Sequence, residues 1–244
     1  MLSPGQRVCN SPPRVHFLAE ASFIIRVDTF WPGMLCEIGL PRFCLLMISV
    51  IKKYRGIEEN KIMIEVRFHG RGGQGAVTSV ELLALAAIDE GKFAQGFPSF
   101  GPERRGAPVV AFSRVSDHYI RLRSKIYTPD AAVVLDPSLL KIVDPSQGLK
   151  PGGLIIINTN KTLDQVRTEF GYQARLALVD ADRIAREELG VPIVNTTMLG
   201  ALIRGTGIVA LDSLTLPLKG RFGRGAERNL KALRRSYEET TLSN

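Results

Sequence analysis

Residues 64–90 read IEVRFHGRGGQGAVTSVELLALAAIDE, and this stretch decides the fold. The pattern predicts a short β-strand over residues 64–69 and a glycine-rich turn over residues 70–75. It predicts a helix over residues 76–90, because apolar side chains recur there at helical spacing. Gly91 follows the acidic end of the last segment, which is typical of a helix stop. A strand, a glycine-rich turn and a helix in this order are typical of an α/β sheet that begins here.

The rest of the chain continues to alternate strands with helices. We expect a three-layer α/β/α fold with a mixed, mostly parallel sheet, because continuous apolar runs such as 131–135 are typical of buried parallel strands. A hairpin-like pair within 109–123 indicates that some strands are antiparallel. The expected strands are 92–97, 109–115, 119–123, 131–135, 154–158 and 176–179, and the expected helices are 180–189, 198–209 and 225–240.

The chain divides into two unlike parts. In residues 1–62, prolines interrupt every short apolar run and no regular period is sustained. We expect an irregular N-terminal extension over 1–62 and one oxidoreductase-type domain over 63–244. The extension is interpreted as sequence upstream of a true start at Met63, with a targeting or docking segment as the alternative.

Composition excludes several classes of protein. The net charge of +8 is spread along the chain without a dense basic block, which argues against nucleic acid as a partner. The longest apolar run, 43–51, is shorter than the roughly 20 residues that span a bilayer, so no membrane partner is expected. Cys9, Cys36 and Cys44 all precede Met63, so the main domain has no thiolate for a metal or cluster. We expect a reduced, cytoplasmic protein without a metal site.

The sequence HGRGGQG, which starts at His69, predicts an anion-binding turn. Glycines allow positive φ and close approach of the backbone, and the following helix directs unpaired N–H groups at a ligand. The turn also matches the dinucleotide pattern G-x-G-x-x-G, but that pattern needs an acid at the end of the second strand, and residues 96–98 supply none. A turn required only for tight packing is the alternative. The candidate residues are Gly70, Arg71, Gly72, Gly73, Gln74 and Gly75.

The second candidate segment is the loop that reads FPSFGPERRGAP over 97–108. It is stiffened by prolines and presents Glu103, Arg104 and Arg105. Adjacent guanidinium groups suit fork-shaped recognition of phosphate or carboxylate. A solvated surface loop is the alternative.

These two segments together resemble the gamma subunit of the 2-oxoacid:ferredoxin oxidoreductases, in the pyruvate/2-oxoisovalerate branch. The sequences DPS at 136–138 and NTTMLG at 195–200 also resemble later landmarks of that family. The similarity covers about residues 63–240, and both long motifs are specific when they occur together.

The resemblance implies a division of labour among several chains. Enzymes of this family decarboxylate a 2-oxoacid on thiamine diphosphate, pass electrons through iron–sulfur clusters to ferredoxin and transfer the acyl group to coenzyme A. The alpha and beta subunits are expected to hold thiamine diphosphate, Mg²⁺ and substrate, and a delta subunit to carry 4Fe–4S clusters. The gamma chain is expected to contribute coenzyme A binding and assembly.

We therefore assign the turn residues 70–75 to a phosphate-bearing ligand, with coenzyme A preferred. Glu103, Arg104 and Arg105 are assigned to the same site or to the boundary with the thiamine-binding chains. No catalytic residue is expected, and His69 is interpreted as structural. Within the family, the sequence leaves open a preference for 2-oxoisovalerate instead of pyruvate. Two other classes of protein also stay open: an NAD(P)-binding oxidoreductase, and a nucleic-acid-binding protein that is favoured only by the pI of about 9.6.

Overall fold

The structure, a computed structural model, describes residues 63–99 and 106–243. The elements of the first half are β1 (Met63–Arg71), α2 (Ala76–Asp89), β2 (Phe93–Pro98), β3 (Pro108–Ser116), β4 (Ala131–Val134), a 3-10 turn (Pro137–Lys141) and β5 (Leu154–Asn158). Those of the second half are α3 (Leu163–Phe170), β6 (Arg175–Val179), α4 (Ala181–Leu189), α5 (Asn195–Thr206), α6 (Thr215–Phe222), α7 (Ala226–Glu239) and β7 (Thr241–Leu242), with short 3-10 turns at Leu211–Leu214 and Gly223–Gly225.

The strands form one mixed sheet in the order β2-β3-β1-β4-β5-β6-β7. At its centre, β1 pairs in parallel with β4, β4 with β5, and β5 with β6. The flanking pairs β1–β3, β2–β3 and β6–β7 are antiparallel. This arrangement confirms the predicted α/β class and its mixed sheet with a parallel centre.

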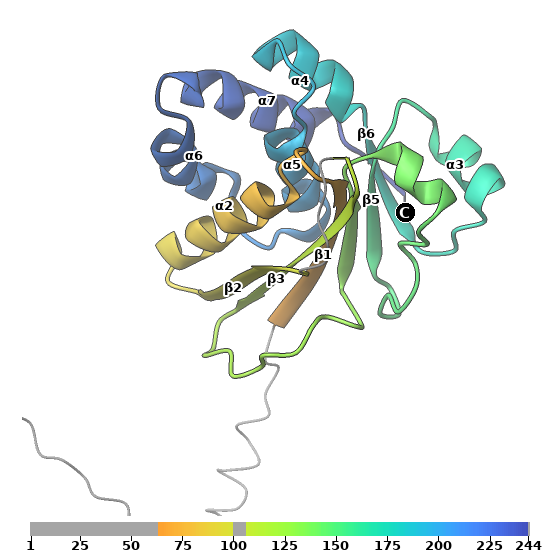
Figure 1. Ribbon diagram of the computed structural model, residues 1–244, viewed down its shortest axis with the longest axis horizontal. Helices are drawn as coiled ribbons and strands as arrows, with labels where there is room; N and C mark the ends of the chain where they lie inside the picture. The colour runs from red at the N-terminus through yellow and green to blue at the C-terminus, as the bar shows by residue number, and fades with distance from the viewer. Residues whose placement is uncertain (1–62, 100–105, 244) are drawn as a thin grey trace, which may run out of the picture. The chain divides into compact units, whose positions relative to one another are not determined.

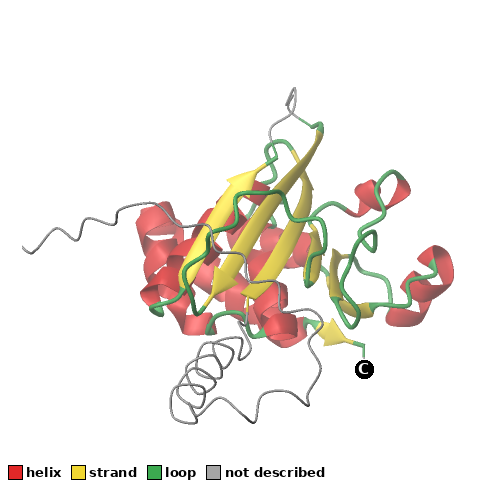
Figure 2. Ribbon diagram, turned by 90° about the horizontal axis from the view of Figure 1, so that it is seen from below, coloured by secondary structure: helices red, strands yellow, loops and turns green. Residues whose placement is uncertain are grey.

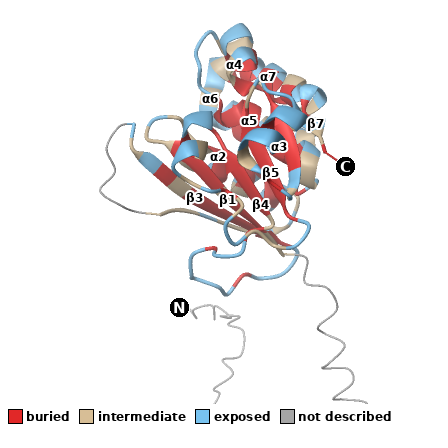
Figure 3. Ribbon diagram, turned by 90° about the vertical axis from the view of Figure 1, so that its right-hand side faces the viewer, coloured by how far each residue is buried: buried red, intermediate tan, exposed pale blue. Residues whose placement is uncertain are grey.

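Helices cover the two faces of the sheet unequally (Figure 1). Helices α2, α4, α5, α6 and α7 pack on one face, where the larger apolar core lies. On the opposite face, α3 packs over β5 and β6 through a smaller apolar cluster that includes Val166 and Ile155. The central strands are therefore buried from both sides (Figure 3).

The prediction of a strand at 119–123 is wrong. Residues 117–130 are irregular and cross the face of the sheet opposite α2, where Gln95 and Arg114 donate hydrogen bonds to the carbonyls of Ile120 and Lys125 (Figure 2). Strand β3 lies between β2 and β1, so both of its edges are already paired. A hairpin partner following β3 therefore has no free edge to join. The sheet is mixed because β3 pairs antiparallel with β1 and β2.

Other element bounds also differ from expectation. Helix α5 begins at Asn195, three residues before the expected start, because the polar residues of its first turn are buried instead of lying in a loop. Helices α3 and α6 and strand β7 were not predicted. Helix α6 is hard to predict from the sequence because it contains Pro217 and Gly220, which disfavour helices. Pro217 is tolerated because it lies in the first turn of α6, where proline removes no helical hydrogen bond.

Residues 1–62 and 100–105 lie outside the described part of the chain. The expected extension over 1–62 and the domain boundary at Met63 therefore stay predictions. Within residues 63–99 and 106–243, no helix combines the length and the apolar character needed to cross a bilayer.

Candidate functional site

The carboxyl ends of β1 and β4 form the natural crevice of this sheet. These two strands are parallel neighbours, but the chain leaves β1 towards β2 and β3, and leaves β4 towards β5. Ligands of open α/β sheets bind where neighbouring connections diverge in this way. The glycine turn follows β1, and Asp136 follows β4, so the sequence-predicted turn lies at this switch point.

Backbone geometry explains the glycines of the turn. Gly73 has φ +97° and Gly75 has φ +82°, in the left-handed region that other residues avoid. Gly70 is extended, but a Cβ at that position would lie 3.3 Å from the Cβ of Ala76. The turn thus needs glycine for conformation at two positions and for close packing at a third.

A set of hydrogen bonds around Asp136 holds the turn in place. The Oδ2 atom of Asp136 accepts from Nε of Arg71 at 3.0 Å and from Nε2 of Gln74 at 2.8 Å. The Oε1 atom of Gln74 in turn accepts from the backbone N–H of Arg71 at 2.7 Å. The guanidinium of Arg71 also donates to Oγ of Ser138 at 2.8 Å and to the carbonyl of Gly106 at 3.0 Å. We call this set of Arg71, Gln74, Asp136 and Ser138 the Asp136 clamp.

The Asp136 carboxyl is ionised at neutral pH. Burial alone would raise its pKa, but hydrogen bonds from Ser138 and Gln74 and the charge of Arg71 outweigh burial and lower the pKa below its ordinary value of 3.8. The clamp is therefore a charged, hydrogen-bonded support for the turn.

The turn and the start of α2 keep backbone donors free. The N–H of Gly72 donates to the carbonyl of Ala107, and that of Gln74 to the carbonyl of Arg71. Helix α2 is capped at its N-terminus by Gly75, without a side-chain hydrogen bond. Within the described residues, no partner is found for the N–H groups of Gly73, Gly75, Ala76, Val77 and Thr78. This geometry, reinforced by the positive end of the helix dipole, suits an anion.

The N-terminus of α5 lies against the same turn. A Cβ at Gly75 would lie 2.9 Å from Nδ2 of Asn195, the first residue of α5. The sequence marks Asn195, Asp136 and Ser138 only as landmarks of the family resemblance and gives none of them a role. A signal for Asp136 was available, because it directly follows a buried strand, but the pairing of that strand with β1 could not be read from the sequence.

The structure places the predicted site residues in two groups. Residues 70–75 are brought together at the crevice, but Arg71 and Gln74 direct their polar atoms into the Asp136 clamp. Their contact with a ligand stays a prediction, and the backbone is the better candidate. Glu103, Arg104 and Arg105 lie outside the described residues, so their assignment stays a prediction.

The geometry at His69 agrees with a structural role. Its side chain is buried, and its Nε2 atom accepts a hydrogen bond from Nε of Arg67 at 3.0 Å. Burial, with a smaller contribution from the charge of Arg67, lowers the pKa of His69 to about 4. The imidazole is therefore neutral at physiological pH, and its Nε2 atom is used in the hydrogen bond from Arg67.

A polar hollow adjoins the crevice along the same edge of the sheet. It measures about 590 Å³ and lies at the carboxyl ends of β5 and β6, beside Pro137. Its lining holds three cations and as many carboxylates: Lys161, Arg183 and Arg186, and Asp180, Asp182 and Glu187. Lys161 pairs with Glu169, and Arg183 with Glu239, which leaves part of this charge neutralised. Because cations and carboxylates balance in its lining, the hollow offers polar hydrogen-bonding surface next to the crevice without favouring an anion by charge.

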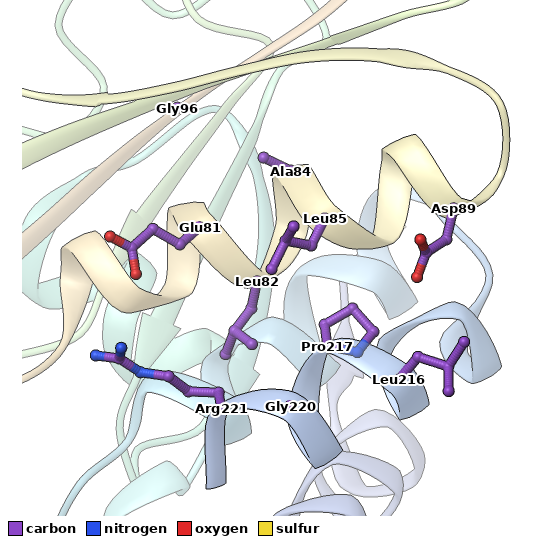
Figure 4. Close-up of a pocket in the computed structure, with 10 residues that line it drawn as sticks. All are labelled: Glu81, Leu82, Ala84, Leu85, Asp89, Gly96, Leu216, Pro217, Gly220 and Arg221. Carbon is purple, nitrogen blue, oxygen red and sulfur yellow. The ribbon is translucent and has the colours of Figure 1, made fainter.

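A second, apolar groove of about 690 Å³ lies between α2 and α6 (Figure 4). Its walls include Leu82, Leu85, Leu216 and Pro217, and Leu216 is 70% exposed. The glycine turn is not part of its lining, which is mostly apolar and holds two carboxylates, Glu81 and Asp89, against one cation, Arg221. This groove therefore has the wrong chemistry for phosphate.

The structure also changes the argument about a dinucleotide. Residues 96–98, searched for a ribose-binding acid, belong to β2, which is an antiparallel edge strand and not the parallel neighbour of β1. The parallel neighbour is β4, which is followed by Asp136. That carboxylate already accepts hydrogen bonds from Arg71 and Gln74, so it is not free for a ribose.

Fold and site together define an α/β domain whose switch-point crevice has backbone donors suited to an anion. Residues 65–239 match the model of the family described as pyruvate ferredoxin/flavodoxin oxidoreductase. The chain is 54% identical over 182 residues to the pyruvate/ketoisovalerate oxidoreductases common subunit gamma of Thermococcus litoralis, which covers 74% of this chain and 98% of the relative.

Solved structures agree with this match. Pyruvate oxidoreductase subunit PORC of Thermotoga maritima superposes with a TM-score of 0.66 and 38% identity, over 76% of this chain and all of that one. A 2-oxoglutarate:ferredoxin oxidoreductase of Magnetococcus marinus, solved with 2-oxoglutarate, coenzyme A and succinyl-CoA bound, has a TM-score of 0.60. At 19% identity, over 74% of this chain and 31% of that chain, the second structure supports the fold alone.

The chain belongs to the pyruvate ferredoxin/flavodoxin oxidoreductase family. Within the family it is a gamma subunit, so the resemblance drawn from the two long motifs is confirmed.

Proposed function

We infer that this chain provides the coenzyme A site of a pyruvate:ferredoxin oxidoreductase (EC 1.2.7.1), the enzyme of which it is the gamma subunit. The complex decarboxylates pyruvate oxidatively, transfers the acetyl group to coenzyme A and passes the electrons to ferredoxin. Alpha and beta subunits hold thiamine diphosphate, Mg²⁺ and pyruvate, and a delta subunit carries the 4Fe–4S clusters. The complex is cytoplasmic. Coenzyme A supplies the thiol that accepts the acyl group.

The free backbone donors at the start of α2 carry this proposal. Coenzyme A bears several phosphate groups, and a helix N-terminus preceded by a glycine turn is a suitable binding site for phosphate. The N–H groups of Gly73 and of residues 75–78 have no partner within the described residues. The residues that fit coenzyme A are therefore the turn and the first turn of α2, with the polar hollow beside Pro137 available to the rest of the molecule.

The loop residues 103–105 and the choice of 2-oxoacid substrate are also part of this proposal. Glu103, Arg104 and Arg105 act at the same site or at the boundary with the thiamine-binding chains. The Thermococcus relative is named for both pyruvate and ketoisovalerate oxidoreductases, which supports 2-oxoisovalerate as a second substrate of the assembled enzyme. The choice of substrate then depends on the chains that bind thiamine diphosphate.

Replacing Gly73 with alanine tests the proposed site. Gly73 has φ +97°, and within the described residues no atom lies within 4 Å of an added Cβ, so alanine there strains the backbone without a clash. Because that strain is on the order of 1–2 kcal/mol, the turn relaxes and its N–H groups lose their common direction. In the intact complex, we expect the KM for coenzyme A to rise about tenfold, with the KM for pyruvate unchanged.

Gly152 provides the matched control. It has φ +74°, also with open space, and lies in a turn before β5, far from the crevice in sequence. Gly152→Ala therefore adds similar strain and should leave the KM for coenzyme A unchanged. Equal KM values for coenzyme A in the Gly73→Ala and Gly152→Ala complexes would contradict the proposal.

A further inference from the structure

Asn195 is a buried side chain at the crevice whose amide nitrogen is unused. The residue is only 4% exposed and opens helix α5. Its Nδ2 atom faces Gly75, since a Cβ placed on that glycine would lie 2.9 Å away. Within the described residues, Nδ2 has no hydrogen-bond partner.

The orientation of this carboxamide is fixed by its oxygen. The Oδ1 atom of Asn195 accepts from the backbone N–H of Thr196 at 2.8 Å. Because an N–H can donate only to an acceptor, the atom at that position must be the oxygen, and the nitrogen must point the other way. The nitrogen is therefore directed at the turn and the start of α2.

Neighbouring hydrogen bonds make this orientation rigid. The hydroxyl of Thr196 donates to Oδ1 of Asn229 at 2.9 Å, and Nδ2 of Asn229 donates to the carbonyl of Gly225 at 2.9 Å. The hydroxyl of Ser79, on α2, lies 3.3 Å from the carbonyl of Asn195. Contacts from α2, α5 and α7 thus fix the position of Asn195. Rotating its carboxamide to pair the nitrogen with another acceptor would break the hydrogen bond that Oδ1 accepts from the N–H of Thr196.

Asn195 is largely buried as a residue, but its amide nitrogen is not among the fully buried side-chain atoms that lack a partner, so this nitrogen is available to donate to a ligand. Here the nitrogen lies beside two helix N-termini, those of α2 and α5, whose dipoles add positive potential. The N–H groups of Gly73 and of residues 75–78, which lack a partner within the described residues, belong to this same turn and helix start. What this set of donors lacks is an acceptor with negative charge.

We propose that the side-chain amide of Asn195 donates a hydrogen bond to a phosphate oxygen of the ligand held at the N-terminus of α2. This inference rests on the proposed function, because it assigns a further binding residue to the same coenzyme site. Asn195 links the glycine turn to α5, so the anion is held between two helices.

The test compares two ligands on the intact complex. Coenzyme A carries phosphates, whereas pantetheine, used as a competitor, carries none. Asn195→Ala should weaken coenzyme A binding about tenfold and leave pantetheine unchanged, because only the phosphate contact is lost. Thr197→Val is the control, since the buried Oγ1 of Thr197 makes no hydrogen bond within the described residues, and it should change neither affinity.

The possible outcomes distinguish a failure of this inference from a failure of the proposed function. Weaker coenzyme A binding with unchanged pantetheine binding supports Asn195 as a phosphate ligand. Unchanged coenzyme A binding by Asn195→Ala, or an equal loss for both ligands, overturns it. If Gly73→Ala raises the KM for coenzyme A while Asn195→Ala does not weaken binding, only the inference fails. If neither variant affects coenzyme A, the proposed function fails as well.

A measurement on the unmodified full chain covers the case in which Asn195→Ala does not assemble. The side-chain N–H₂ resonances of Asn195 are followed by nuclear magnetic resonance during titration with coenzyme A and then with pantetheine. Shifts that saturate with coenzyme A and are absent with pantetheine are expected. Unmoved resonances at saturating coenzyme A would overturn the inference.

Discussion

At the scale of single residues, Asp136 determines the shape of the crevice. One carboxylate oxygen accepts from both Arg71 and Gln74, so a residue after β4 fixes a turn that follows β1. The clamp turns the two most polar side chains of the glycine motif inward. The backbone of the turn, and not these side chains, is therefore left to bind the anion that we propose for this site.

Replacing Asp136 with asparagine should lower the free energy of unfolding at pH 7 by about 1 kcal/mol. The charge-assisted bonds to Arg71 and Gln74 weaken, but the clamp borders solvent and is screened. The folded-state pKa of Asp136 lies below its ordinary value of 3.8, so its stabilisation is present above that value and is lost as the pH falls through the folded pKa. Chemical unfolding at several pH values measures this difference.

The difference between Asp136→Asn and the unmodified chain should hold constant from pH 7 to about pH 5 and shrink below about pH 4. Asp212→Asn is the control, because Asp212 is exposed and, in the part of the chain that the structure describes, pairs only with Arg234 at 3.4 Å. A difference that grows on acidification would show that Asp136 is not held ionised by the clamp.

Residue-level chemistry was partly readable from the sequence. The glycine turn and its place between strand and helix followed from the spacing of residues 64–90. The inward direction of Arg71 and Gln74 did not, because it depends on Asp136, 65 residues away from Arg71. A binding role for Asn195 could not be predicted either. A polar residue at the start of a helix is common, and only the structure shows that this one is buried against Gly75.

At the scale of elements, the contact between α5 and α7 supports the crevice from behind. Gly200, in the middle of α5, allows this approach, because a Cβ there would collide with the carbonyl of Leu233 and lie 3.1 Å from Cβ of Ser236. Ser236 also donates to the carbonyl of Thr197 at 2.5 Å. The start of α5, and with it Asn195, is therefore positioned by α7.

Gly200→Ala should lower the free energy of unfolding by about 2–3 kcal/mol, because the added methyl overpacks a contact between two helix backbones. Gly220→Ala is the matched control, since Gly220 also lies within a helix, is exposed and has nothing within 4 Å of an added Cβ. It should stabilise the chain by up to about 1 kcal/mol through helix propensity. Urea unfolding of both variants measures the contrast, and a neutral Gly200→Ala would contradict this packing.

Element prediction failed where tertiary structure overrides local pattern. The segment 119–123 has strand-like alternation, but both edges of β3 are occupied, so the segment crosses the sheet instead. Helix α3 was missed because it is short and buries only Val166. The long periodic segments, such as those that became α2 and α7, were predicted to within two residues at each end.

At the scale of the whole molecule, the polar crevice and the apolar groove of the described domain lie in different places. The crevice that we propose to bind an anion and the polar hollow lie at the carboxyl edge of the parallel strands. The apolar groove lies between α2 and α6. Both surfaces share α2, whose N-terminus borders the crevice and whose side lines the groove. The parallel centre of the sheet, which could be predicted from buried apolar runs, is what brings the distant turn, Asp136 and Asn195 to one edge.

The central claim is that backbone amides at the start of α2 bind the phosphates of coenzyme A. Amide hydrogen exchange on the intact complex, with and without saturating coenzyme A, tests it most directly. The account predicts that coenzyme A slows exchange at Gly73 and at residues 75–78, whose N–H groups lack a partner within the described residues. Unchanged exchange at these amides, with protection elsewhere in the complex, would contradict it.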